Sequence, residues 1–586
     1  MLRFTLRRIL QVVPTIVVVA LLIFVIFSVV PGTFAASLFA DGKRAADPQM
    51  IARLNEEFGL NKPLMERFVT YVTDLAQFDL GTSFRTRQPV IDLINDRMGA
   101  SLQLAVAAMV FAIVVGVPLG FLAALRPGSI LDTVTMIGAV SGLSMPQFWL
   151  GLLMMYLFAL QLNWLPSFGY GDGSFRNLIL PAVTLGVTPL ALLARTTRAG
   201  VLDVLNADFI RTAHSKGMSE AKVVRWHVAQ CAGADRHHGR PAVRLADRPG
   251  RRHRKAVRLA GHRLAAGRQC GDPRHSRGAG HDPRHRAVVP DHQHRRRSGL
   301  CRDRPAHQAG VTTVRLGFNF WLGATLTALV IFAGVLAHWI APFDPVLDAD
   351  LMNSELPPDA TFWFGTDGQG RDVYTRILYG AQISLTVGIV SQVINSIIGV
   401  TLGMTAGYWG GWWDDLVNGL TNVMLAIPSL IFALAVMAVL GPGLPSLLIA
   451  LGLTNWSWTC RIARSSTLSL KSQGYVQAAQ TLGYGDLRIM FTQILPNMMG
   501  PILVMATLGM GSAVLSEAAL SFLGLGIQPP FPSWGSMLTD ARQLIQLAPW
   551  AALFPGLAIF LSVLGFNLLG DGLRDSLDPH MRTRKP

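Results

Sequence analysis

Long apolar segments alternate with short polar stretches along most of the chain. Each apolar segment is about 20 residues long, the length of a helix that crosses a bilayer. We expect four such spans before a strongly polar tract and six after it. They lie near residues 9–31, 102–124, 134–160 and 178–198, and then near 317–341, 382–406, 415–440, 444–460, 496–516 and 546–569. Because a segment in lipid must satisfy its backbone hydrogen bonds internally, the pattern predicts an all-α polytopic membrane protein.

The uncharged stretch from Leu416 to Cys460 is too long for a single span. The tripeptide Gly441-Pro442-Gly443 interrupts it, and Gly and Pro together are typical of a turn. We therefore predict two helices that meet at these residues.

Residues 229–310 differ from the rest of the chain in composition. They hold 20 Lys and Arg against 6 Asp, with 10 of the 14 His, and they lack Ile, Met, Phe, Tyr, Trp, Thr, Asn and Glu. This tract therefore supplies +14 of the formal net charge of +16. Since it has few large apolar residues to offset the entropy of ordering, we expect it to lack a packed core and to lie on the cytoplasmic side.

Three interpretations of this basic tract are open. Clustered Arg side chains suit a disordered arm that binds nucleic acid. Cys231, Cys270 and Cys301 with the histidines suggest a metal site, although no Cys-x-x-Cys pair is present. The third interpretation is translation in the wrong reading frame.

A frame shifted by one base accounts for the most observations. In GC-rich DNA it converts Arg, His and Ala codons into codons for Val, Gly, Ile and Leu, which is the composition of a membrane span. The shifted frame permits the string EKLFAWPGIG across Arg254 to Leu264, the string DPRIR across Arg304 to Ala309, and a stop codon within Val311-Thr312. We therefore interpret the chain as two adjacent genes fused by a one-base slip near Val228. Its parts are a truncated first half, 1–228, the out-of-frame tract, 229–310, and a complete second half, 311–586.

Positive charge flanking the spans predicts their orientation, since Lys and Arg concentrate on the cytoplasmic side. The residues are Arg3, Arg7 and Arg8 before the first span, Arg195, Arg198, Arg211 and Lys216 after the fourth, and Arg461, Arg464 and Lys471 in the second half. Both termini should therefore be cytoplasmic. The length of the first apolar run and Pro31-Gly32 argue against a cleavable signal peptide. Outside the basic tract Cys460 is the single cysteine, so no disulfide framework is expected.

Two loops, 208–217 and 474–483, align with each other, with small residues and then a Gly at matching positions. A short helix with a small-residue face can seat closely against another protein, and the Gly allows a sharp turn after it. The candidate contact residues are Arg211, Thr212, Ala213, Lys216 and Gly217, and then Ala478, Ala479 and Gly483. An ordinary amphipathic loop helix would explain one such copy, but two copies after the fourth span of each half favour a shared function.

These loops resemble the coupling loop of binding-protein-dependent ABC importer permeases, in particular the dipeptide, oligopeptide and nickel family. The first half resembles the B-type subunit in Phe58-Gly-Leu-Asn-Lys-Pro63, Leu143-Ser-Met-Pro-Gln-Phe148 and Arg211-Thr-Ala213. The second half resembles the C-type subunit in Phe364-Gly-Thr-Asp-Gly-Gln-Gly-Arg-Asp372, Gly407-Tyr-Trp-Gly-Gly411, Glu517-Ala-Ala-Leu-Ser-Phe-Leu-Gly-Leu-Gly526 and Leu577-Asp-Pro579. The shifted-frame strings match what the B-type family has after its coupling loop.

The resemblance implies a permease of the bacterial cytoplasmic (inner) membrane. A solute-binding protein outside would deliver a peptide or similar small solute, and two ABC ATPase subunits would grip the two coupling loops. ATP and Mg²⁺ would lie on those partner chains. The sequence agrees, since it has no Gly-x-x-x-x-Gly-Lys-Ser/Thr loop to cradle phosphates. We expect no catalytic residue, metal site or cofactor on this chain, and no bound nucleic acid.

A polar, Gly-rich loop in the second half is the remaining candidate site. Its residues Gly365, Thr366, Asp367, Gly370, Arg371 and Asp372 suit docking of the binding protein, or a turn-rich gate that only packs. Glu517 and Asp414-Asp415 are expected at the ends of spans, where interfacial water solvates them. A secondary transporter or channel would need charges inside the membrane, of which the spans have almost none. A membrane-tethered nucleic-acid binder would need the basic tract to be genuine.

Overall fold

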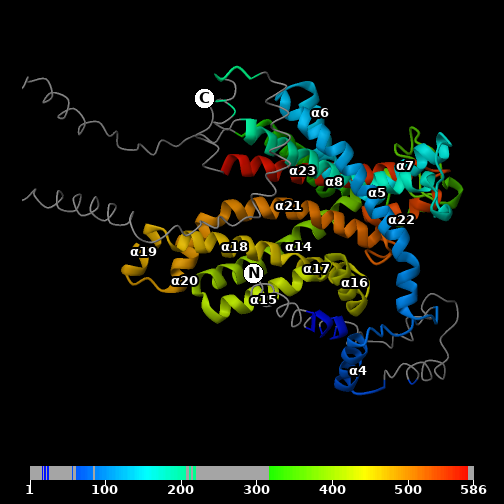
Figure 1. The fold of residues 1–586 in the computed structure, drawn as a ribbon. Helices are drawn as coiled ribbons and strands as arrows, with labels where there is room; N and C mark the ends of the chain where they lie inside the picture. Colours follow the sequence, from blue (N-terminus) through cyan, green and yellow to red (C-terminus); the bar gives the residue numbers. More distant parts are fainter. Residues whose placement is uncertain are drawn as a thin grey trace, which may run out of the picture. The chain divides into compact units, whose positions relative to one another are not determined.

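The computed structural model describes residues 61–83, 86–205 and 316–577, together with 16–17, 19–21, 23–25, 56, 210, 212 and 215–218. The basic tract lies outside these residues. The chain divides into one unit made of 1–202 and 315–586 and a second unit of 203–314. In the described part every regular element is a helix, and the only β features are isolated bridges at Thr82–Pro89 and Thr366–Asp372. The predicted all-α fold is confirmed (Figure 1).

The α-helices of the first half whose bounds the structure describes are α4 (Leu64–Ala76), α5 (Val90–Leu125), α6 (Ile130–Ser144), α7 (Gln147–Met154) and α8 (Phe175–Leu205). A π-helical turn, Met155–Gln161, extends α7. The second half contains α12 (Phe318–Val335), α13 (Ala337–Ile340), α14 (Val373–Trp409), α15 (Gly411–Ala426), α16 (Ser429–Leu440), α17 (Leu444–Thr454), α18 (Trp456–Lys471), α19 (Gly474–Thr481), α20 (Asp486–Ile489), α21 (Leu495–Phe522), α22 (Trp534–Leu544) and α23 (Trp550–Leu577).

Six described helical segments are long and apolar enough to cross a membrane: α5, α8, α12, α14, α20 continued into α21, and α23. They correspond to six of the ten predicted spans. The predicted span 9–31 lies mostly outside the described residues. The predicted break at Gly441 is confirmed, because this residue has a φ of 80° between α16 and α17.

Three predicted spans differ from the structure. Segments 134–160 and 415–440 are not single straight helices, because α6 and α7 meet at 107° and α15 and α16 at 88°. The bends fall at Met145 and Ile427, each of which precedes a proline. Their ψ values are 126° and 124°. Proline disfavours the helical conformation for the residue before it, so the chain turns there. Segment 444–460 is interrupted at Asn455, where α17 ends and α18 begins.

The two halves repeat one close helix crossing. In α5 a Cβ added to Gly116 or Gly120 would lie 2.8 or 2.3 Å from a carbonyl oxygen of α8. In α14 a Cβ on Gly399 or Gly403 would lie 2.7 or 2.3 Å from a carbonyl oxygen of α18. Small residues let helix backbones approach closely in a membrane, where dispersion rather than water exclusion drives packing. The α5–α8 pair is therefore the counterpart of the α14–α18 pair.

Candidate functional site

The segment of the second half that the sequence predicts to couple to an ATPase, called the coupling segment below, consists of α19 and the turn after it. Val476 and Ala479 are buried and pack against Ile489, Met490 and other apolar residues of the same half. Ala478 lies on the opposite side of the helix and is exposed. The two neighbouring alanines therefore have different roles. Ala479 packs the helix against the rest of the second half, and Ala478 lies on the exposed face of the helix.

Gly483 ends this segment in the left-handed region, with a φ of 78°. No atom lies within 4 Å of a Cβ built on it. Glycine is therefore required by the positive φ of the turn and not by close packing around the residue. Gly217 at the aligned position of the first-half loop has a φ of 74°. The conformation that we predicted from the paired loops is confirmed at both glycines.

Two aromatic residues at the end of α14 hold the coupling segment in place. The Tyr408 hydroxyl donates a hydrogen bond to Asp486 Oδ1 at 3.0 Å, and Trp409 Nε1 donates to Asp486 Oδ2 at 3.2 Å. Lys471 donates to the Tyr408 carbonyl oxygen from the end of α18. We did not single out these side chains from the sequence, although Tyr408 and Trp409 stand in the motif that carries the family resemblance.

The first-half coupling loop is described only at Ile210, Thr212 and 215–218, which lie in the second unit. There the Ser215 hydroxyl and the Lys216 amide both donate to the Thr212 carbonyl oxygen, at 2.8 and 3.2 Å. This is the end of a helical turn, as in α19. Arg211 and Ala213 lie outside the described residues.

A bidentate ion pair recurs near the coupling end of each half. Arg198 of α8 donates two hydrogen bonds to Asp132 in the first turn of α6, at 2.5 and 2.8 Å. Arg464 of α18 donates two to Asp414 in the first turn of α15, at 2.5 and 2.6 Å. Each pair ties the helix that leads into a coupling loop to the start of a bent helix pair. Because each guanidinium group donates two hydrogen bonds to one carboxylate, these ion pairs are stronger than hydrogen bonds between neutral groups.

Asp414 lies in the first turn of α15, at a helix end as predicted, but Arg464 and not interfacial water pairs with its carboxyl group, which corrects the expectation of solvation. The sequence contained a signal for the two arginines, because Arg198 and Arg464 precede the two aligned loops by a similar number of residues. The carboxyl partners could not be identified in advance, because their positions depend on how α6 and α15 pack.

We predict that the Arg464–Asp414 pair stabilises the fold by about 1–2 kcal/mol, since both groups are only partly exposed and the bonds are charge-assisted. The measurement is a double-mutant cycle of Arg464→Ala and Asp414→Ala on thermal unfolding in detergent. Arg461→Ala is the control, because this neighbouring arginine is exposed and bonds to the neutral Asn422. Equal effects of the Arg461 and Arg464 changes, with no coupling to Asp414, would contradict the prediction.

The first and second halves meet through α6 and α7 against α23. Trp149 Nε1 donates to the Ala552 carbonyl oxygen at 3.0 Å, and its indole lies so close to Gly556 that a Cβ there would meet it at 2.0 Å. Asn567 Nδ2 donates to the Ser144 hydroxyl at 3.0 Å. These contacts bury Trp149 among residues of the second half. The break at Met145-Pro146 is what directs α7 toward α23.

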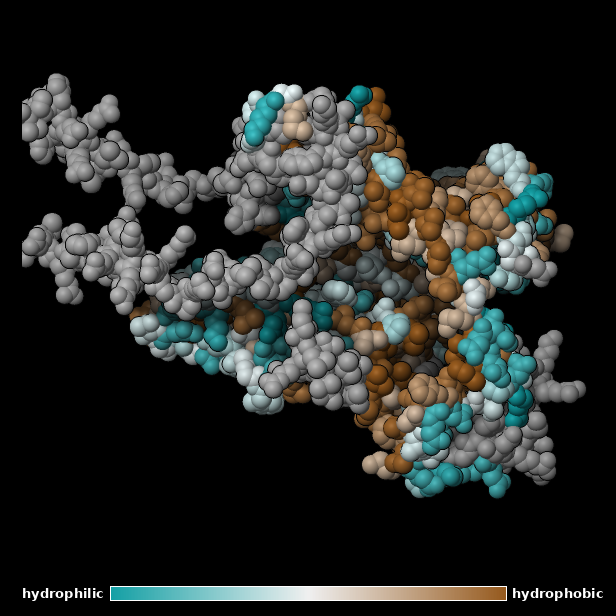
Figure 2. Space-filling view, viewed as in Figure 1, coloured by the Kyte–Doolittle hydropathy of each residue, from teal (hydrophilic) through white to brown (hydrophobic). Residues whose placement is uncertain are grey.

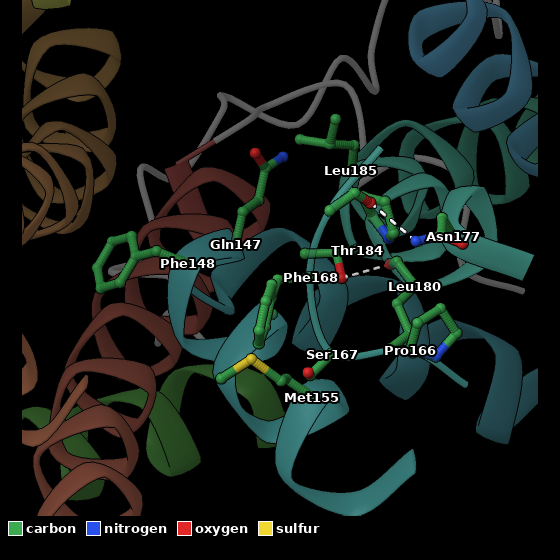
Figure 3. A pocket seen from close by; sticks show the side chains of 13 residues that line it. Gln147, Phe148, Met155, Pro166, Ser167, Phe168, Asn177, Leu180, Thr184 and Leu185 are labelled. Carbon is green, nitrogen blue, oxygen red and sulfur yellow. Dashed lines mark hydrogen bonds between the residues drawn. The ribbon is translucent and has the colours of Figure 1, made fainter. Parts of the chain in front are cut away.

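A cavity of about 640 Å³ lies beside this interface, between α7 and α8. Its wall is mainly apolar, with polar groups at Gln147, Ser167, Asn177 and Thr184. Figure 3 shows these side chains around the cavity, with Asn177 bonded to the Gly169 carbonyl oxygen. The neighbouring Phe148, which also lines the cavity, stacks on Phe522 of α21 at a centroid distance of 5.0 Å. The cavity therefore adjoins the line along which the two halves meet.

The Gly-rich loop before α14 is not an open surface in this structure. Thr366, Asp367, Arg371 and Asp372 are all buried. Arg371 Nε donates to Asp367 Oδ2 at 2.8 Å, and Asp372 caps α14 by accepting from the Thr375 amide at 2.8 Å. Burial raises the pKa of Asp372, and the hydrogen bonds from Thr375 oppose that rise.

Two glycines of this loop are required by the close packing around them. A Cβ on Gly370 would lie 1.7 Å from the Asp350 carbonyl oxygen, and one on Gly365 would lie 2.5 Å from Trp550 Nε1. Arg371 also reaches Asp540 of α22 at 3.5 Å. The six candidate residues of this loop therefore lie together, and Arg371 connects the loop to α22. We call this arrangement the brace. This arrangement favours the gate interpretation over docking by these side chains.

Glu517 occupies a fully buried position on α21, which corrects the expectation of a solvated span end. Hydroxyl groups surround it: Ser384 of α14 donates to Oε2 at 3.0 Å and Ser521 donates to Oε1 at 2.8 Å. The carboxyl group therefore links α14 to α21.

Comparison with known proteins agrees with this architecture. The family model described as "Binding-protein-dependent transport system inner membrane component" matches residues 116–229 and again 399–583. The model of the N-terminal region of such components matches residues 1–105.

Curated relatives match a stretch of about half the chain. A dipeptide transport system permease protein DppC of Alkalihalophilus pseudofirmus is 49% identical over 250 residues, which are 42% of this chain and 82% of the relative. A di/tripeptide transport system permease protein DppC of Pseudomonas aeruginosa is 43% identical, covering 44% of this chain and 88% of the relative. A glutathione transport system permease protein GsiD of Shigella flexneri is 45% identical, covering 44% and 86%.

The same family model matches the chain twice, once in each of the halves that share the close helix crossing and the bidentate ion pair. Several apolar helices long enough to span a membrane accompany these matches. The chain therefore belongs to the family of binding-protein-dependent transport system inner membrane components, as a multi-pass permease of ABC importers that carries the family's domain in two copies.

Proposed function

We propose that this permease imports peptides or similar small solutes, driven by two ABC ATPase subunits on separate chains. The observation that carries the proposal is the coupling segment of α19, whose inner face is fixed to the chain and whose outer face is exposed. Tyr475, Ala478 and Leu482 lie on this outer face, and they follow one another at helical spacing. Leu482 is 73% exposed, so its side chain is free to seat in a groove of another protein.

Transport would follow from rigid coupling of this seat to the spans. A force on α19 reaches α14 through Asp486 and Tyr408, and α18 connects to α15 through Arg464 and Asp414. The α6–α7 bend and α23 carry movement to the line between the halves. The solute path would run along that line, beside the cavity between α7 and α8. Peptides fit its mixture of apolar wall and amide groups, and the names of the relatives support a peptide solute.

We propose that both termini are cytoplasmic and that the solute-binding protein acts on the other side. Arg461, Arg464, Lys471 and Arg488 gather at the end of the second half that carries α19, in agreement with the positive-inside rule. The Gly365–Asp372 brace would then lie on the outer side, where it would gate entry of the solute.

We further propose the one-base slip near Val228, with 229–310 as out-of-frame translation. The first match of the family model ends at residue 229, whereas the second continues to 583. The second half also has helices, α21 to α23, that follow its coupling segment, and the first half has none among the described residues. The permitted shifted-frame strings supply apolar sequence where those helices are due.

Copurification tests the coupling assignment. We expect tagged chain expressed with its neighbouring ATPase genes to retain the ATPases through detergent extraction, and Leu482→Asp to reduce the retained amount about tenfold by placing a charge in an apolar seat. Leu347→Asp is the control, because Leu347 is similarly exposed and lies in the loop before α14. Equal retention by both variants would overturn the coupling assignment.

A further inference from the structure

One face of α5 is uncovered in a way that its counterpart on α14 is not. The face consists of Met98, Ser101, Leu102, Ala105 and Met109, at helical spacing, all exposed. We call this set the bare stripe. Figure 2 shows hydrophobic residues over the surface where α5 runs.

The repeated crossing gives the register between α5 and α14. Gly116 and Gly120 contact α8 as Gly399 and Gly403 contact α18. Counting back along each helix from these glycines pairs the bare stripe with five positions of α14. These counterparts are all buried, and they are Ala381, Ser384, Leu385, Gly388 and Gln392.

The difference in exposure is large. Leu102 is 61% exposed and its counterpart Leu385 is 6% exposed. Met109 is 49% exposed and its counterpart Gln392 is 6% exposed. Another stripe of the same helix shows no such difference, since Val114 is 63% exposed and its counterpart Ile397 is 62% exposed. This position is therefore exposed in both halves, and the bare stripe is a separate surface.

Helix α21 contacts Ser384, Gly388 and Gln392 of the counterpart stripe on α14, whereas Ala381 lies against Gly334 of α12. Ser384 donates to Glu517 of α21 at 3.0 Å. A Cβ on Gly388 would lie 3.0 Å from Val514, and Gly509 of α21 lies against the amide of Gln392. The cover is thus an apolar helix with one carboxyl group at the level of Ser384.

We propose that the bare stripe is the seat of a helix equivalent to α21, encoded by the shifted frame of residues 229–310. Ser101 stands where Ser384 stands, so the seated helix should present a carboxyl group to Ser101. The permitted string EKLFAWPGIG begins with Glu, as Glu517-Ala-Ala-Leu-Ser-Phe-Leu-Gly-Leu-Gly526 does, and both strings end in Gly-x-Gly. This inference rests on the proposed slip. It adds the position of the restored helix and the partner of its glutamate.

Spin labels in membranes test the seating. Single cysteines at Leu102, Val114 and Leu385 are labelled in a background without the native cysteines, and collision with dissolved oxygen measures contact with lipid. The variants are made in the chain as written and in the frame-restored gene. We expect the label at Leu102 to lose oxygen contact several-fold when the frame is restored. Val114 should stay accessible and Leu385 shielded in both forms.

Each other outcome overturns the proposal. Unchanged accessibility at Leu102 after restoration means that the restored helix lies elsewhere. Shielding of Leu102 in the chain as written means that another occupant, such as a second copy of this chain, already covers the stripe. DNA whose shifted frame lacks apolar sequence refutes the slip itself, and uptake is not needed for any of these measurements.

A second pair of variants tests the carboxyl contact. In the frame-restored protein Ser101→Ala should lower the unfolding temperature by about as much as Ser384→Ala, because each removes one donor from a buried carboxyl group. In the chain as written Ser101→Ala should have no effect. An equal effect of Ser101→Ala in both forms would show that Ser101 has no partner on the restored helix.

Discussion

Restoring the reading frame near codon 228 is expected to raise peptide uptake from background to a level typical of an importer, on the order of 100-fold. Among the described residues the first half has no counterparts of α21 and α23, as the proposed slip predicts. In the second half these two helices provide the cover of α14 and the contact with α7. Without them one side of the pathway is missing, and ATPase closure has nothing to move there.

The measurement is uptake of labelled dipeptide into cells that lack their own peptide importers, with the chain, its binding protein and its ATPases expressed together. Mass spectrometry should find two proteins of about six spans each, the second starting at the codon of Val311. A frame-restored gene with a stop placed in the shifted frame before the first apolar string is the control. This control should not transport, because its stop codon ends translation before the helices that the restored frame encodes. Transport by the chain as written would refute the slip as a lesion.

Replacing Gly483 with valine is expected to reduce coupled uptake at least tenfold while the protein still folds. Valine at a φ of 78° places its Cβ against its own backbone, at a cost of about 1–3 kcal/mol, so the turn after α19 changes shape. No neighbouring atom lies within 4 Å of that Cβ, so packing of the spans is untouched.

Gly485→Val is the matched control. Gly485 lies two residues further along the same turn, with a φ of −66° and equally open space around its Cβ. It should retain uptake, ATPase retention and unfolding temperature. If the two variants behave alike in uptake and ATP hydrolysis, the left-handed turn has no part in coupling.

Prediction succeeded where the signal is local. Span length follows from the hydrocarbon thickness, and the conformation at Gly217 and Gly483 follows from the absence of a Cβ, so both could be inferred from a few adjacent residues. The bends at Met145 and Ile427 also had a local signal in the prolines that follow them. We treated those segments as straight because apolar length alone does not show a change of direction.

Prediction failed where the partner of a side chain lies far along the chain. Asp414 and Glu517 were expected in interfacial water because charges at the ends of apolar segments usually are. Arg464 and Ser384 replace that water, and each lies on another helix. The same holds for the polar, Gly-rich loop before α14, whose composition suggested an open surface but whose Arg371 is buried against α22.

The sequence by itself determined the class of the protein: a helical membrane permease in two similar halves, separated by a tract of foreign composition. Hydrophobic length, charge asymmetry and paired motifs are properties of short stretches, and they survive without knowledge of packing. Only the tertiary structure decided which groups meet across the helices. It showed that Tyr408 holds the coupling segment, that Arg198 and Arg464 play the same part in the two halves, and that α5 bears a stripe which α14 has covered. Such pairings depend on close approach between helices distant in sequence, and the carbonyl contacts of Gly116 and Gly403 exist only after the backbones have come together.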